Sequence, residues 1–139
     1  MFAARTALLV IFVMIPILSA ANGFIYAAVY ACDPVRFTSS FVAACSSSHP
    51  RMIAQLDSAF EAWKVRNDLA SQRSARACAD EMRRRVTSED QFREMAAMMK
   101  RAEIESDDAT KKIAESAEWC AHILEGLQSG RLDVDAALK

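Results

Sequence analysis

Apolar residues recur every three or four positions along two long stretches of the chain. In the first stretch, from Pro50 to Arg85, apolar and small side chains fall on one face of a helix and charged side chains fall elsewhere. The second stretch, from Ser88 to Gln128, has the same period. A period near 3.6 residues predicts amphipathic α-helices. We expect the two apolar faces to bury each other, because neither helix is stable alone in water.

The boundary between the two stretches carries the clearest local signal. Ser88, followed three positions later by Gln91, forms a capping box, and two acidic residues occupy the first turn, where the helix dipole favours them. The sequence therefore predicts a helical hairpin over residues 50–130, with its turn just before Ser88. Gly130 suits the position after a helix end. Residues 131–139 are expected to form a C-terminal tail with a helical turn or two.

Composition agrees with this pattern. The chain has 139 residues, enough for one small domain, and only three glycines and three prolines. Alanine and methionine are frequent, and both favour helices. We expect an all-α fold, a long antiparallel helical hairpin with a short N-terminal segment, residues 22–49, packed beside it. Because the core of a two-helix hairpin is thin, we expect disulfides to staple it.

The first thirty residues predict export. A single arginine precedes the uncharged apolar run Ala7–Leu18, and small residues follow it, which is the layout of a signal peptide over residues 1–21. The apolar character resumes further on, so residues 7–31 would span a bilayer if they were retained. We expect a periplasmic or secreted protein, with an N-terminal anchor in the inner membrane as the alternative. Lipidation of Cys32, at the end of this run, is a third interpretation.

The four cysteines of an exported protein are expected to pair. A turn just before Ser88 brings Cys120 level with the start of the first helix, so we expect Cys45–Cys120 to join the open end of the hairpin. This leaves Cys32–Cys78, although Cys78 lies about 40 Å along the first helix. The bridge then needs an extended N-terminal segment or a kink at residues 71–74. The pairing of Cys32 with Cys120 would leave Cys45–Cys78, which has the same problem of reach.

The sequence offers little chemistry for catalysis. It contains no G-x-S-x-G, glycine-rich phosphate loop, H-E-x-x-H or paired C-x-x-C motif. The two histidines, His49 and His122, are not spaced from Cys45 and Cys120 as in zinc sites. A net charge of −1 gives no overall field to attract nucleic acid. We therefore expect no enzyme, no cofactor, no metal site and no nucleic-acid partner.

Two groups of residues on the first helix are candidate partner contacts. Trp63 and Arg66 belong to the residue types enriched in binding hot spots, although a tryptophan on the inner face is more often part of the core. Arg83, Arg84 and Arg85 form a basic cluster at the end of this helix, where positive charge also complements the helix dipole.

Two further features concern the inner faces. Asn67 needs a hydrogen-bond partner, for which we expect a backbone carbonyl of the N-terminal segment. The methionines near the turn form either core or an adaptable partner surface (Met82, Met95, Met98 and Met99). Together these features predict an inhibitor, immunity or accessory protein that binds another protein of the envelope. The alternative is a membrane-anchored structural protein of the cell envelope.

Overall fold

The computed structural model describes residues 27–139, and every regular element in that range is helical. The signal-peptide prediction for residues 1–21, and most of the alternative anchor over residues 7–31, lie outside this range. None of the described helices is long and apolar enough to cross a membrane. Residues 27–32 are helical, and the elements that follow are α3 (Pro34–Ser48), the 3₁₀ turn η1 (Pro50–Met52), α4 (Ile53–Arg85), α5 (Glu89–Ala114), α6 (Ala117–Ser129) and α7 (Val134–Ala137). The prediction of an all-α fold is confirmed.

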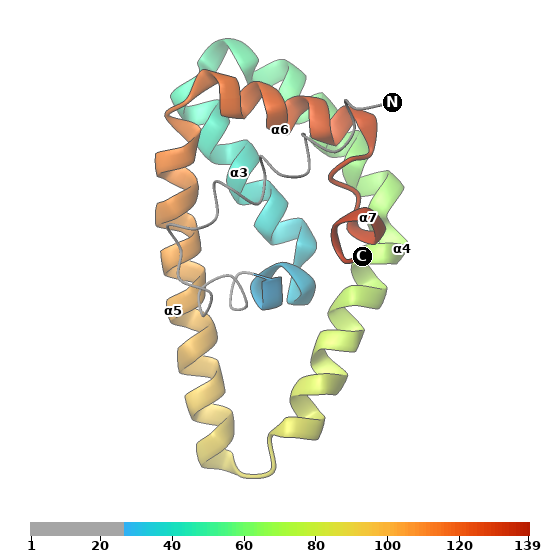
Figure 1. Ribbon diagram of the computed structural model, residues 1–139, viewed down its shortest axis with the longest axis vertical. Helices are drawn as coiled ribbons and strands as arrows, with labels where there is room; N and C mark the ends of the chain where they lie inside the picture. The colour runs from blue at the N-terminus through green and yellow to red at the C-terminus, as the bar shows by residue number, and fades with distance from the viewer. Residues whose placement is uncertain (1–26) are drawn as a thin grey trace, which may run out of the picture.

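The hairpin of α4 and α5 forms as expected, but α3 lies between its two arms. Ser88 caps α5 by accepting a hydrogen bond from the backbone N–H of Gln91. From this turn the two helices diverge, and α3 packs against both of them (Figure 1). The face of α5 that is buried consists of small side chains, which allow α3 a close approach (Ala102, Ser106, Thr110 and Ala114). The expectation that the two long helices bury each other is therefore wrong.

The predicted second helix is divided in two. α5 ends at Ala114, and α6 turns across the open end of the hairpin and packs against α4 (Figure 1). At the break, Ser116 has extended backbone and its hydroxyl accepts a hydrogen bond from the N–H of Trp119 at 3.3 Å. The prediction of an uninterrupted helix to Gln128 is wrong. The apolar spacing continues through this cap, so the spacing alone gives no sign of the break. Gly130, with a φ of 80°, ends α6 as expected.

Both expected disulfides are formed. Cys45 bonds to Cys120 and Cys32 bonds to Cys78, with Cα atoms 5.6 Å and 5.1 Å apart. The second bridge needs neither an extended segment nor a kink, because α4 is continuous and α3 descends diagonally between the arms (Figure 1). Lipidation of Cys32 is incompatible with this disulfide, because both would use the same sulfur atom. Two such bonds are typical of an oxidising compartment outside the cytosol.

The core occupies only the open end of the hairpin. Its largest fully buried side chains come from α3, α4, α6 and α7 (Pro34, Cys45, Leu56, Trp63, Cys120, Leu127 and Val134). Along α4 no residue after Ser74 is buried, and along α5 none before Ala102. The apolar side chains near the turn are consequently half-buried or exposed.

Candidate functional site

Trp63 belongs to the core and not to a surface patch. Its side chain is fully buried, stacks on Phe60 with ring centroids 5.9 Å apart, and donates from Nε1 to the carbonyl of Leu132 at 2.8 Å. The hypothesis that Trp63 contacts a partner directly is therefore wrong. The hydrogen bond from Trp63 instead ties α4 to the segment that follows α6.

Arg66 and Asn67 fasten the same segment. The guanidinium of Arg66 donates to both carboxylate oxygens of Asp133 at 2.9–3.1 Å, and to the carbonyl of Leu127 at 2.6 Å. The amide of Asn67 donates to Asp133 at 3.0 Å and accepts from the N–H of Val134 at 2.9 Å. The predicted partner of Asn67 in the N-terminal segment is thus wrong. We call Trp63, Arg66 and Asn67 of α4, together with Leu132 and Asp133 of the segment after α6, the C-terminal clamp.

The surroundings of the clamp shift the pKa values of two groups, Asp133 and the nearby Tyr30. The hydrogen bond from Arg66, helped by that from Asn67, lowers the pKa of Asp133 below its usual value, although burial opposes this shift. Burial raises the pKa of Tyr30 to about 12, and the negative charge of Asp133 adds to this effect. At neutral pH the ionised carboxylate of Asp133 in the clamp is therefore accompanied by the neutral phenol of Tyr30.

The lowered pKa of Asp133 predicts a specific pH dependence. The ordinary pKa of an aspartate is near 3.8, and in the folded protein the pKa of Asp133 is lower. Asp133 therefore stabilises the fold fully above the ordinary pKa, and this stabilisation is lost as the pH falls through the folded-state pKa. We expect Asp133→Asn to lower the midpoint of urea unfolding at pH 7, and the gap to the parent protein to narrow progressively as the pH falls below 3.8. Asp135→Asn is the control, because its pair with Arg73 is largely exposed. A gap between the two midpoints that stays the same from pH 7 down into this acidic range contradicts the assignment.

Gly126 of α6 faces the clamp, and alanine does not fit there. A Cβ atom at this position would lie 2.6 Å from Cγ of Leu132. Leu132 cannot withdraw freely, because its N–H donates to the Gly126 carbonyl at 3.1 Å and its own carbonyl accepts from Trp63. We expect Gly126→Ala to cost about 1–2 kcal/mol in thermal or urea unfolding, despite the better helix propensity of alanine. The double variant with Leu132→Ala should lose less than the sum of the two single changes.

The basic cluster lies in the exposed last turn of α4 and is partly neutralised. Arg84 and Arg85 pair with Glu81 at 2.8 Å and 2.5 Å, and Arg83 pairs with Asp80. The hydrogen bond from Arg85, with the charges of Arg84 and Arg85, lowers the pKa of Glu81. The cluster therefore offers a partner less net positive charge than three arginines alone would.

A groove opens beside the turn, next to this cluster. We call it the tip groove; its volume is about 570 Å³. Its sides combine apolar and charged side chains (Arg85, Val86, Gln91, Glu94, Met95, Ala97, Met98 and Arg101). Met98 is 40% exposed and Phe92, beside Gln91, is 57% exposed. The methionines near the turn were expected to form either core or an adaptable partner surface. Met98 is exposed as in the second alternative, whereas Met82, Met95 and Met99 are half-buried.

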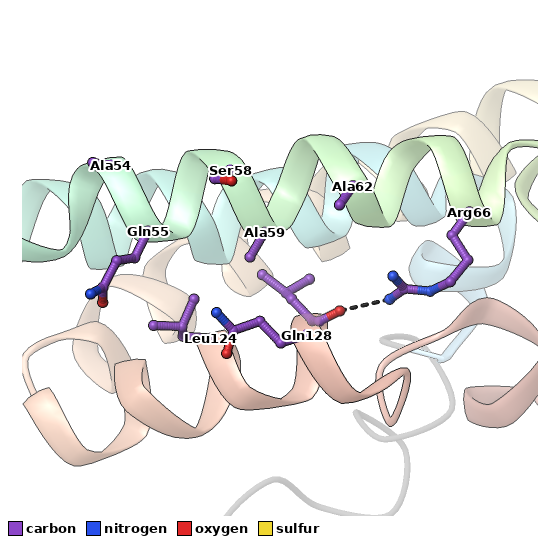
Figure 2. Close-up of a pocket in the computed structure, with 9 residues that line it drawn as sticks. Ala54, Gln55, Ser58, Ala59, Ala62, Arg66, Leu124 and Gln128 are labelled. Carbon is purple, nitrogen blue, oxygen red and sulfur yellow. Dashed lines mark hydrogen bonds between the residues drawn. The ribbon is translucent and has the colours of Figure 1, made fainter.

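A second groove runs between α4 and α6, where side chains from both helices face each other (Figure 2). Its lining includes Ser58 but contains no histidine or carboxylate that would act as its base (Ala54, Gln55, Ser58, Ala59, Ala62, Arg66, Leu124, Leu127 and Gln128). Across residues 27–139, no three potential metal ligands lie together. His49 instead bonds the carbonyl of Ala114 at 2.8 Å, and His122 lies near Glu118 and Glu125.

Sequence reasoning missed Asp133, the central acceptor of the clamp. Nothing in the local pattern marks it, since an aspartate after a helix end is common in solvated tails. The basic cluster and the methionines do come together at the turn, whereas Trp63 and Arg66 lie in the clamp. In the comparisons with known proteins, no protein-family model, no curated protein and no solved structure matches this chain.

Proposed function

We propose that the protein is exported to the periplasm and acts there by binding another protein through the tip groove, without catalysing a reaction. The observation that carries the proposal is the end of the core well before the turn. Apolar positions continue along α5 to Phe92, yet no residue before Ala102 is buried. Concave apolar surface that a protein does not fill itself is typical of an interaction site.

The chemistry of the tip groove favours an amphipathic helix as the bound element. Val86, Met95 and Met98 supply apolar surface, and methionine side chains adapt to the shape of a partner. Arg85 and Arg101 border the groove against one acid, Glu94. A helix that laid its apolar face on the methionines and carried carboxylates on its flank would complement both features.

Export is supported by the signal-peptide pattern of residues 1–21 and by the two disulfides. The intact mass of the protein recovered from the envelope tests it. A chain that begins near residue 22 supports a free periplasmic protein. A chain that retains residues 1–21 overturns that part of the proposal and supports the membrane-anchored structural protein instead.

Site-specific photo-crosslinking tests the binding surface. A photoreactive amino acid at position 98 lies in the tip groove, and the same amino acid at position 104 is the matched control. Ile104 is also an exposed apolar residue of α5, at 52% exposure, but it does not line the groove. We expect a discrete protein adduct from position 98 in intact cells and none from position 104.

The adduct should also depend on the chemistry of the groove. Met95→Asp places a charge on its apolar surface and should abolish the adduct, whereas Arg93→Asp, on an exposed part of the same helix, should leave it. Equal labelling from positions 98 and 104, or an adduct that survives Met95→Asp, would show that the tip groove is not the binding surface.

A further inference from the structure

The outer face of α4 carries an exposed apolar pair away from the tip groove. Val65 is 81% exposed and Leu69, one helical turn later, is 69% exposed. Both lie opposite the buried face of α4, which contains Trp63, Asn67 and Ser71. These are the two most exposed large apolar side chains of residues 27–139. Nothing in the core explains them, because the helices that contact α4 pack against its other sides.

The spacing around this pair is that of a helix–helix seam. Ala62, Val65, Leu69 and Gln72 follow one another at intervals of three, four and three residues, as the inner positions of a coiled coil do. Towards the start of α4 the seam continues over small side chains. Ala54, Ser58 and Ala62 follow one another along α4 beside the groove in Figure 2, and they would allow a second helix a close approach.

The charges that flank the seam differ in sign between its two sides. One side carries Glu61 and Asp68, and the other carries Arg66 and Arg73. When two copies of a helix pair in parallel, each flank meets the opposite flank of the second copy, five residues further on. Glu61 would then face Arg66, and Asp68 would face Arg73. In an antiparallel pair like flanks meet, so acid would face acid and base would face base.

We propose that α4 binds α4 of a second copy of this chain in a parallel, two-fold arrangement centred on Val65 and Leu69. The pair of Asp68 with Arg73 is the more available of the two ion pairs. Arg73 is 63% exposed and its contact with Asp135, at 3.2 Å, is open to solvent, whereas Arg66 is held in the clamp. The apolar seam is short, so we expect a concentration-dependent equilibrium between monomer and dimer.

Sedimentation velocity tests the proposal on the exported protein with both disulfides formed. We expect a dimer that grows with concentration into the millimolar range. Val65→Ser or Leu69→Ser should abolish it, and Ile104→Ser, a matched exposed apolar residue on α5, should leave it unchanged. A parent protein that stays monomeric throughout, or a dimer that survives both seam changes, overturns the proposal.

Charge reversal tests the orientation. Asp68→Arg and Arg73→Asp, each alone, should raise the dissociation constant about tenfold or more, because an attraction becomes a repulsion at both symmetric pairs. An equimolar mixture of the two single variants should associate again, since each chain then supplies the charge that the other lacks. Failure of the mixture to associate, with both variants folded by circular dichroism, contradicts the parallel arrangement.

Discussion

Replacement of Trp63 by alanine is expected to lower the free energy of unfolding by about 4 kcal/mol. The side chain is fully buried, packs in the main core cluster with Leu56 and Leu127, and spans the space between α4 and the segment after α6. Its loss would leave a cavity and also an unpaired carbonyl on Leu132. Because small domains have total stabilities of about 5–15 kcal/mol, this change removes a large part of the whole.

Two further variants separate packing from hydrogen bonding at Trp63. Trp63→Phe keeps most of the apolar volume but removes the Nε1 donor, so we expect a smaller loss of about 1–3 kcal/mol. Trp119→Ala is the matched control, since Trp119 is only half-buried. Urea unfolding followed by far-ultraviolet circular dichroism measures all three without relying on tryptophan fluorescence. A loss of unfolding free energy for Trp63→Ala no larger than that for Trp119→Ala would show that Trp63 does not stabilise the core as proposed.

The features that the sequence predicts well are those set by local chemistry. The helical hairpin, the cap at Ser88 and the end of α6 at Gly130 all follow from side chains within a few positions of the boundary. The disulfide Cys45–Cys120 also follows, because the turn returns the chain to the open end of the hairpin, where Cys120 meets Cys45 just before the first long helix. These predictions need only helix geometry and capping preferences.

The position of α3 does not follow from such local rules. Thr38 and Val42 of α3 are buried between α4 and α5, yet the segment is short and mixed in character. The small side chains of α5 that make room for it give an apolar stripe too weak to distinguish a contact with α4 from one with α3. The break at Ser116 was missed for a related reason, since a mid-pattern serine is also common on a solvated helix face.

The candidate site likewise combines residues that the local sequence marks with contacts that it does not. Trp63, Arg66 and Asn67 are all recognisable as unusual residues of α4, but the acceptors that tie them to the C-terminal segment are 66 or more residues away in sequence. Asp133 accepts from Arg66 and Asn67, and the carbonyl of Leu132 accepts from Trp63. A single sequence gives no means to pair them. The methionines and arginines near the turn, in contrast, are close in sequence, and the tip groove that they line opens because α4 diverges from α5 (Figure 1).

Removal of the disulfide Cys45–Cys120, by changing both cysteines to alanine, is expected to cost about 4 kcal/mol of unfolding free energy. The bond closes a loop with a sequence separation of 75, so it removes much conformational freedom from the unfolded chain. Its two residues are also 1% and 0% exposed and belong to the main core cluster. Urea unfolding under non-reducing conditions measures the loss.

The second disulfide is the internal control for this argument. Cys32–Cys78 has a sequence separation of 46, and loop entropy alone predicts a loss for the double alanine variant within about 0.5 kcal/mol of the first. Cys32 and Cys78, however, are only half-buried, at the lower edge of the core. We therefore expect Cys45→Ala/Cys120→Ala to be the more damaging pair by more than the entropy difference, because it also removes buried sulfur atoms. Equal losses would mean that the bridges act only on the unfolded chain, and that packing around Cys45 and Cys120 adds nothing to the stability of the fold.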